Sequence, residues 1–289
     1  MTVPNFMIIG VAKAGTTSLF RYLDQHPQVF MCPMKGTNFF GYEDACAWRP
    51  DEGDPPLLRH FQVRTFDAYE AMFAGASGEI AVGEASPQYF RCPTAARRIR
   101  QCLPEVKLVA SLRNPADRAF SGFLMRTRRG EKVKSVYDEL NSDSSHVIEG
   151  FYYRRLKRYF DIFPRRQVKI CVFEEFKRDP RAVLADLFAF LGVDRNFVPD
   201  TSVRHNPAGV PKSRLMNRLY YNPIVIRAAK AVLPANMQGV AKRLRGQNLQ
   251  LPPKCPADLR ADLLRLYRDD ILKLETLLDR NLSMWLGAT

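Results

Sequence analysis

Short apolar runs alternate with helix-length segments over the first two thirds of the chain, and this alternation constrains the fold more than any other feature. The runs lie at residues 5–11, 80–83, 106–112 and 168–173. Each is predominantly apolar, as in a strand buried on both faces. Helical patterns follow at 18–23, 94–102, 115–129, 149–163 and 180–191. The order predicts an α/β fold, a three-layer sandwich whose central parallel sheet is flanked by helices.

The strand pattern ends at Asp194, and the remainder indicates helices, the last over 256–280. We therefore expect one domain, residues 1–289, with an α/β core at 1–194 and a helical C-terminal portion at 195–289. A stretch rich in Pro, Gly and charge, Cys46 to Arg64, predicts a long loop.

Charge and composition narrow the function classes. The 289 residues include 44 Lys and Arg against 30 Asp and Glu, a formal net charge of +14, which favours anionic ligands. The sequence has no apolar run of the roughly 20 residues that a membrane-spanning helix needs, and it shows no export signal. The six cysteines are scattered without metal-binding spacing. We expect a cytoplasmic protein with no transmembrane segment and no structural metal.

The first apolar run leads into a glycine-containing loop and then a helix. The segment reads Gly10-Val11-Ala12-Lys13-Ala14-Gly15-Thr16-Thr17-Ser18. Backbone N–H groups and the positive end of the dipole at a helix N-terminus attract an anion. Lys13 adds a charge, and Thr16, Thr17 and Ser18 add hydroxyl donors. The segment resembles a Walker A loop, but it lacks the Lys-Ser or Lys-Thr that follows the second glycine there.

A second phosphate-type segment follows the strand at 106–112. It begins with Arg113-Asn114-Pro115 and reaches Ser121 about two helical turns later. Arg113 leaves the carboxyl end of a parallel strand, where open α/β sheets bind ligands, and a guanidinium suits a phosphate dianion. Arg113 and Ser121 are therefore candidate anion ligands.

These two segments resemble those of sulfotransferases that use 3′-phosphoadenosine 5′-phosphosulfate (PAPS). Lys13 to Ser18, with Ala14 and Gly15, looks like the family's 5′-phosphosulfate loop, and Arg113 to Ser121 is similar to its 3′-phosphate motif. The resemblance implies a P-loop-like fold and transfer of a sulfuryl group from PAPS to a hydroxyl or amine. The product would be 3′,5′-ADP, and the acceptor a small molecule, a glycan or a lipid.

Further segments are similar to the bacterial, heparan-sulfate-type branch of that family. They include Gly83-Glu84-Ala85-Ser86-Pro87 and Phe190-Leu191-Gly192. The family leads us to expect a third ligand segment for the 3′-phosphate, and Pro211-Lys212-Ser213-Arg214 is the best candidate. A sulfuryl group carries less charge than a phosphoryl group, so lysine and backbone donors suffice for the leaving phosphate and no metal is required. Lys13 is the candidate that meets the charge on the leaving oxygen.

The resemblance breaks down at the residue that should accept the acceptor's proton. In the heparan-sulfate-type branch this base is the Glu of a Lys-Glu-x-x-Phe-Phe motif, and here the motif reads Lys35-Gly36-Thr37-Asn38-Phe39-Phe40. A glycine cannot take a proton, and Ala85 likewise replaces a family lysine. Either the base has moved, the acceptor needs none, or the chain is catalytically impaired.

Glu84 is the first candidate for a relocated base, because it follows the second strand on the expected ligand side of the sheet. Glu43, Asp44, His60 and His205 come next. Asn38, Phe39, Phe40 and His60 are expected to line the acceptor pocket.

Two rival functions remain at this point. A P-loop kinase needs the missing Lys-Ser or Lys-Thr pair and a carboxylate for Mg²⁺. A nucleic-acid-binding protein would explain the net charge and the basic cluster between Arg126 and Lys134, but no recognisable groove-binding or RNA-binding motif is present.

Overall fold

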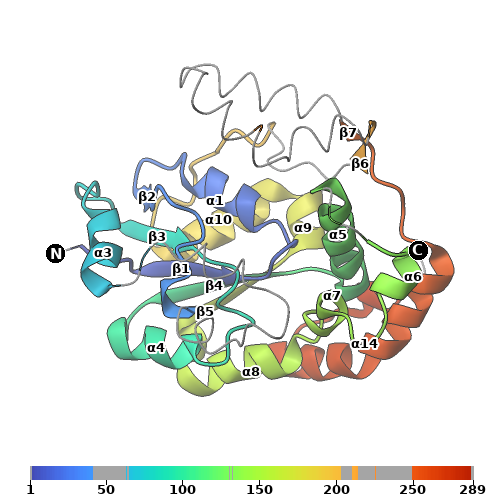
Figure 1. Cartoon of the computed structure of the whole chain (residues 1–289). Helices are drawn as coiled ribbons and strands as arrows, with labels where there is room; N and C mark the ends of the chain where they lie inside the picture. The colour runs from blue at the N-terminus through green and yellow to red at the C-terminus, as the bar shows by residue number, and fades with distance from the viewer. Residues whose placement is uncertain are drawn as a thin grey trace. The chain divides into compact units, whose positions relative to one another are not determined.

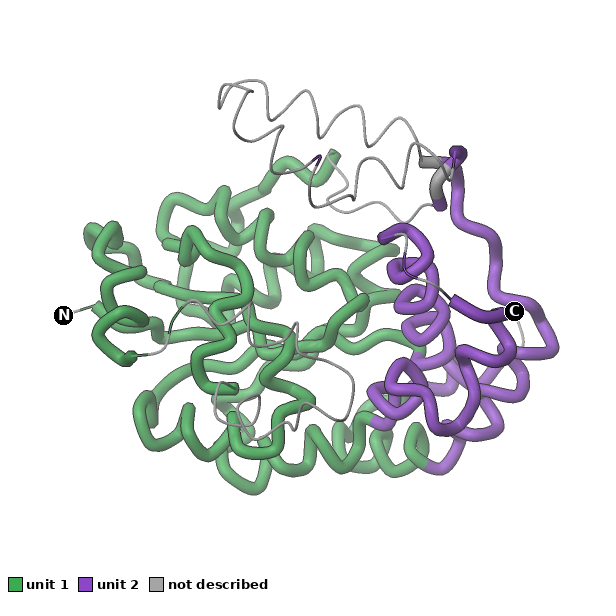
Figure 2. The backbone as a smooth tube through the Cα atoms, in the orientation of Figure 1, with its two compact units in different colours: residues 1–114, 152–206, 270–281 green, residues 115–151, 207–269, 282–289 purple. Residues whose placement is uncertain are grey.

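The computed structural model describes residues 2–41, 63, 65–129, 131, 133–202, 210–213, 225 and 249–287. The chain divides into two compact units (Figure 2), each assembled from three chain segments. The first comprises residues 1–114, 152–206 and 270–281, and the second 115–151, 207–269 and 282–289. This division does not follow the predicted boundary at Asp194, and the single domain stays a prediction. Of the predicted loop at 46–64, only Val63 lies within the described residues.

The first unit is built on a five-stranded sheet (Figure 1). Its strands are β1 (Phe6–Gly10), β2 (Val29–Met31), β3 (Ala81–Ala85), β4 (Lys107–Leu112) and β5 (Val168–Val172). They lie in the order β2-β3-β1-β4-β5, and every neighbouring pair is parallel. The predicted parallel sheet is confirmed. The three-residue strand β2 is the member that the sequence pattern did not indicate.

Helices cover both faces of this sheet, as Figure 1 shows. On one face lie α1 (Thr16–Leu23), α9 (Phe173–Arg178) and α10 (Pro180–Leu191), and on the other α4 (Ala95–Cys102) and α8 (Tyr153–Ile162). All five residues of β1 are buried, and Phe6 and Ile8 pack in the core beneath α1 and α10. The predicted three-layer α/β sandwich is therefore confirmed for this unit.

The direction of the connections identifies where this sheet can bind a ligand. The chain leaves β1 through α1 toward the β2 edge, whereas it leaves β4 toward the β5 edge. Adjacent strands whose connections depart in opposite directions leave a crevice at their carboxyl ends, and such switch points hold ligands in open α/β sheets. The switch point lies between β1 and β4, the two strands that precede the predicted phosphate-binding segments.

Shorter segments complete the first unit. They are η1 (Phe39–Gly41), α3 (Phe66–Glu70), η4 (Ala71–Phe73), η5 (Arg165–Gln167) and residues 270–278 of α14 (Ala257–Leu278). α10 begins where the Asp179 side chain accepts a hydrogen bond from the Ala182 N–H, 3.0 Å away, and it ends at Gly192 in a left-handed conformation. Both ends agree with the predicted helix.

The second unit is mainly helical. It contains α5 (Pro115–Arg128), α6 (Val136–Glu139), α7 (Ser145–Ile148), residues 257–269 of α14 and η7 (Ser283–Trp285). It also contains an antiparallel pair of two-residue strands, β6 (Val210–Pro211) and β7 (Leu249–Gln250). The predicted helical C-terminal portion is confirmed by α14, whereas this pair of strands was not predicted, because strands this short show no alternating pattern. Among the described helices of the chain, none is long and apolar enough to cross a membrane.

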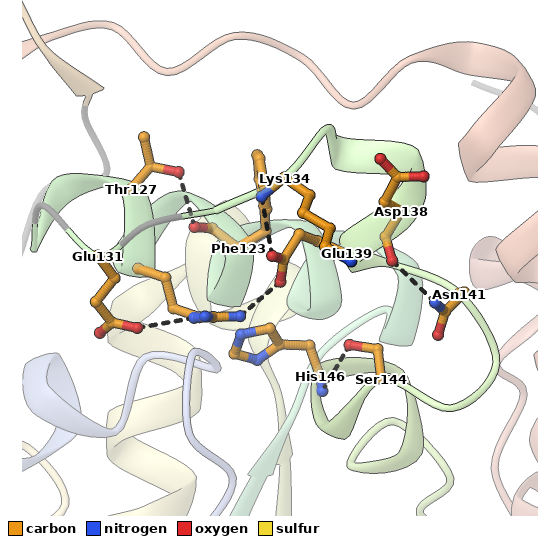
Figure 3. A network of polar contacts seen from close by, with 10 residues as sticks. Phe123, Thr127, Glu131, Lys134, Asp138, Glu139, Asn141, Ser144 and His146 are labelled. Atoms are coloured by element: carbon orange, nitrogen blue, oxygen red, sulfur yellow. Dashed lines mark hydrogen bonds and ion pairs between the residues drawn. The ribbon is translucent and has the colours of Figure 1, made fainter. Parts of the chain in front are cut away.

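A network of charged side chains lies within the second unit (Figure 3). Arg126 donates hydrogen bonds to Glu131 and Glu139, at 2.8 and 2.5 Å. The imidazole of His146 lies close to this network, and its Nε2 is buried without a hydrogen-bond partner among the described residues. Burial lowers the pKa of His146, and the positive charges of Arg118 and Arg126 lower it further, although Glu149 and Glu139 oppose them.

His146 should make the stability of the protein depend on pH. Its folded-state pKa is below the ordinary 6.5, so the unfolded chain binds the proton more readily. The free energy of unfolding should then be greatest above pH 6.5 and fall as the pH drops below that value. Urea unfolding from pH 8 to pH 5.5 should show a shallower decline for His146→Gln than for the wild type. Identical slopes would contradict this assignment.

Candidate functional site

The loop between β1 and α1 forms an anion-binding geometry. Gly15 is the N-cap of α1, no side chain caps the helix, and its first turn carries no acidic residue. A helix start of this kind presents backbone N–H groups and the positive end of its dipole to an anion. Lys13, Thr17 and Ser18 are half-buried at this helix start, whereas Thr16 is buried. The structure therefore brings the predicted loop residues to one helix N-terminus.

Two features of the backbone explain the residues in this loop. Gly15 has φ +81°, and a Cβ there would lie 2.9 Å from the ring of Phe173, so both conformation and space require glycine. Lys13 adopts φ +74°, which is uncommon for a residue with a side chain. Such conformations persist where the surrounding structure enforces them, and they cluster at functional sites.

Arg113, a predicted phosphate ligand, lies against this loop. One guanidinium N–H donates to the carbonyl of Lys13 at 3.1 Å, and the guanidinium lies 4.8 Å from the ring centroid of Phe173. The Tyr152 hydroxyl donates to the Arg113 carbonyl at 2.9 Å. Ser111 adds a further tie, since its buried hydroxyl donates to the carbonyl of Ala14 at 2.6 Å. The loop and Arg113 thus form one hydrogen-bonded site at the switch point.

The other predicted phosphate ligands belong to the second unit. Ser121 is half-buried on α5, and Lys212 and Ser213 directly follow β6, with Lys212 exposed. Within this unit α5 packs against β6, so these two predicted segments lie together. Arg214 lies outside the described residues. The roles of all four residues stay predictions.

Glu84 is buried at the carboxyl end of β3, with none of its side chain exposed. Its Oε1 accepts hydrogen bonds from Tyr69 and Tyr89, at 2.9 and 2.8 Å, and its Oε2 accepts from Thr37 and Ser86, at 2.7 and 2.8 Å. Burial raises the pKa of this carboxyl, and the four hydroxyl donors counteract the rise without cancelling it.

This arrangement favours a structural role for Glu84 over the predicted role as base. A general base needs an oxygen within hydrogen-bond reach of the acceptor, and both oxygens of Glu84 are occupied by protein hydroxyls in a site with no exposed surface. The other predicted bases, Glu43, Asp44, His60 and His205, lie outside the described residues.

The loop that carries the altered motif is fixed by the same cluster. The Gly36 N–H donates to the Ala85 carbonyl at 2.8 Å, Thr37 bonds Glu84, and the Asn38 N–H donates to the Ser86 hydroxyl at 3.0 Å. Gly36 has φ +85° and Asn38 has φ +52°. The side-chain carbonyl of Asn38 is buried and has no hydrogen-bond partner in the described chain.

Phe39 and Phe40 are buried in an aromatic cluster. The ring of Phe39 stacks on that of Tyr69 with centroids 4.8 Å apart, and Phe40 meets the same ring edge-on at 5.3 Å. These contacts hold the altered loop in place. The contribution of either ring to an acceptor pocket stays a prediction, and the predicted pocket residue His60 lies outside the described chain.

Comparison with known proteins identifies the family. The model of the sulfotransferase family matches residues 4–197. The chain belongs to the sulfotransferase family. A crystal structure of a sulfotransferase from Alicyclobacillus acidocaldarius covers 99% of this chain and 100% of its own, with 33% sequence identity and a TM-score of 0.73. The predicted family and fold class are thereby confirmed.

Similar curated proteins include human heparan sulfate sulfotransferases. The bifunctional heparan sulfate N-deacetylase/N-sulfotransferase 2 is 26% identical over 213 residues, which are 66% of this chain and 22% of that protein. The heparan sulfate glucosamine 3-O-sulfotransferase 6 is 28% identical over 202 residues, 66% of this chain and 53% of its own length. The chain thus aligns with between about a fifth and a half of these relatives.

Several residues that support the sulfotransferase site were not identified from the sequence. Ser86 and Tyr89 follow Glu84 within six residues. Their hydroxyls, so close in sequence to an acid at the end of a buried strand, were a signal that could have identified them. Tyr69, Tyr152 and Phe173 are far from the motifs in sequence and reach the site only through the fold, so no local pattern marks them.

Replacing Glu84 by glutamine should test its structural role. The variant Glu84→Gln would put amide N–H donors where the cluster needs acceptors, and unsatisfied buried donors cost about 1–3 kcal/mol. Urea unfolding should show that loss, whereas the exposed Glu105→Gln should change stability by about 0.5 kcal/mol or less. A Glu84→Gln protein of wild-type stability that has lost sulfuryl transfer would instead support Glu84 as the base.

Proposed function

We propose that this chain transfers a sulfuryl group from PAPS to a hydroxyl or amine of an acceptor, with 3′,5′-ADP as the second product. The observation that carries the proposal is the anion-binding loop at the β1–β4 switch point, with Arg113 bonded to the Lys13 carbonyl at 3.1 Å. The residues fit this donor, because two phosphate groups require backbone N–H groups, hydroxyls and fixed cations, and this edge of the sheet supplies all three.

Each residue at this edge has a separate task in the proposed reaction. The α1 N-terminus, with Thr16, Thr17 and Ser18, holds the 5′-phosphosulfate. Lys13 faces the bridging oxygen, which gains negative charge as the bond to sulfur breaks. Arg113 holds the 3′-phosphate, a group that takes no part in the transfer. Ser121 and the segment at Lys212–Ser213 are proposed as further ligands of that phosphate.

The acceptor class is proposed from the relatives and the charge. Two human relatives carry heparan sulfate in their names, and a net charge of +14 attracts an acidic polymer or another anionic acceptor. An acidic glycan that presents an amine or a hydroxyl is therefore the favoured acceptor. A small molecule or a lipid is the alternative.

A second candidate function is favoured by one observation. Gly36 stands where the heparan-sulfate-type branch has its base, so the chain could bind PAPS or 3′,5′-ADP without transferring sulfuryl groups. Incubation with ³⁵S-labelled PAPS and N-desulfated heparan sulfate separates the two functions, since only the first labels the glycan. The same assay without Mg²⁺ tests the prediction that no metal is required.

Donor recognition should be visible as ligand-specific stabilisation. A ligand at about 100 times its dissociation constant adds about 2.7 kcal/mol to folded-state stability. We expect 3′,5′-ADP to raise the melting temperature by several degrees, and ATP, ADP and 5′-AMP much less, because they leave the 3′-phosphate ligands without a partner. Equal shifts with ATP and 3′,5′-ADP would count against PAPS as the donor.

Substitution of the two cations should separate catalysis from binding. Lys13→Ala should lower the transfer rate about a hundredfold or more, the range for one lost electrostatic contact to the transition state, with a smaller effect on 3′,5′-ADP affinity. Arg113→Ala should chiefly weaken affinity. Lys177→Ala, at an exposed lysine of α9, serves as the control. Indistinguishable effects of the two substitutions would refute the division of tasks.

A further inference from the structure

The proposed reaction leaves one proton without an identified destination. A hydroxyl, or an amine in its neutral form, must lose a proton as its oxygen or nitrogen bonds to sulfur, and a positioned base accelerates that step. Gly36 offers none, and the carboxylate of Glu84 is enclosed by four hydroxyls. The inference below rests on the proposed function.

The loop at residues 35–38 is held firmly beside the donor-binding edge. The N–H groups of Gly36 and Asn38 donate to the Ala85 carbonyl and the Ser86 hydroxyl at the end of β3. The Ser86 N–H in turn donates to the Ile8 carbonyl of β1 at 3.0 Å. β1 pairs directly with β3, so one interstrand spacing, about 5 Å, separates this anchor from the strand that leads into the anion-binding loop. A side chain of this loop needs only a short reach to meet an acceptor there.

Asn38 marks this loop as a place for a ligand. Its backbone has a left-handed conformation, and its buried side-chain carbonyl lacks a donor in the described chain. Buried polar atoms without a partner are rare in folded proteins and call for an explanation. An acceptor O–H or N–H would supply the missing hydrogen bond.

Lys35 is the ionisable residue of the same loop. It is half-buried, and no ion pair joins its amine to a carboxylate of the described residues. The charged group that acts on it is Arg21 of α1, whose own partner is Asp24 at 3.5 Å. Arg21 lies five residues into α1, about 8 Å along the helix from its anion-binding start.

We propose that the Lys35 amine, in its neutral form, takes the acceptor's proton in place of the missing carboxylate at position 36, while the Asn38 side-chain carbonyl orients the acceptor. The acceptor oxygen or nitrogen forms a bond to sulfur, and the bond from sulfur to the bridging oxygen breaks. Its electron pair stays on the 5′-phosphate of 3′,5′-ADP. The proton moves to Lys35 Nζ and later returns to water.

The surroundings of Lys35 favour the neutral form of its amine. Burial lowers the pKa of Lys35 from the ordinary 10.5, and the positive charge of Arg21 lowers it further. The carboxylate of the nearby Glu84 accepts hydrogen bonds from four hydroxyls, one of them that of Thr37, and forms no ion pair with Lys35 among the described residues. Transfer should therefore increase with pH and level off below the ordinary lysine pKa.

Two substitutions of Lys35 distinguish a base from a fixed cation. Lys35→Met removes the amine and should lower transfer to the glucosamine amines of N-desulfated heparan sulfate about a hundredfold. Lys35→Arg keeps the charge, but a guanidinium does not give up its proton, so the same loss is expected. Full activity in Lys35→Arg would show that the residue acts only as a cation and would overturn the proposal.

A rescue experiment restores a base one residue away. In the Lys35→Met background, Gly36→Glu should recover at least tenfold in rate, and Gly36→Ala should not. The alanine variant is the matched control, since it carries the same strain of a side chain at φ +85°. Rescue by alanine as strong as by glutamate would overturn the role of a base.

Two readouts separate this inference from the proposed function. An acceptor already ionised at pH 8, p-nitrophenol, needs no base, so its sulfation should be unchanged in Lys35→Met. The melting shift with 3′,5′-ADP should also match the wild type, because Lys35 does not hold the donor. Loss of that shift in the wild-type chain would contradict the proposed function itself. A normal shift with undiminished amine sulfation in Lys35→Met would overturn only the role of Lys35.

Discussion

The parallel pairing of β1 with β3 on one side and β4 on the other fixes the candidate site. The anion-binding loop follows β1, Arg113 follows β4, and the Glu84 motif ends β3. Because parallel strands share one carboxyl edge, these segments meet although about 100 residues of sequence separate them. Hydrogen bonds between the loops then hold these segments together, such as the bond from the Arg113 guanidinium to the Lys13 carbonyl.

The buried carboxyl of Glu84 is the second fixed point. Removing a carboxylate from water is costly unless hydrogen bonds replace its hydration. The fold supplies four hydroxyl donors, two from residues that precede β3 in the sequence and two from residues that follow it. The same bonds orient the loop that contains Gly36 and Asn38. The hydrogen bonds that offset the cost of burying Glu84 thus also hold this loop at the carboxyl end of β3.

The sequence predicted much of the fold and the site because both depend on local signals. Buried runs identified four of the five strands, and the strand-loop-helix segments placed Lys13 and Arg113 at one edge. β2 has three residues and β6 and β7 have two each, too few for a periodic pattern. The sequence alone could not identify Glu84 as a structural residue. Three of its four hydrogen-bond partners, Thr37, Tyr69 and Tyr89, reach it only through the fold or through the turn after β3.

The conformation of Gly36 changes the meaning of the altered motif. A glutamate at φ +85° would be strained by about 1 kcal/mol, so an exchange of glutamate for glycine does more than remove a carboxylate. It also permits a left-handed turn, which the bond from the Gly36 N–H to the Ala85 carbonyl then holds. The backbone at position 36 thus disfavours a side chain without excluding one, and the same loop places the amine-bearing Lys35 directly beside it.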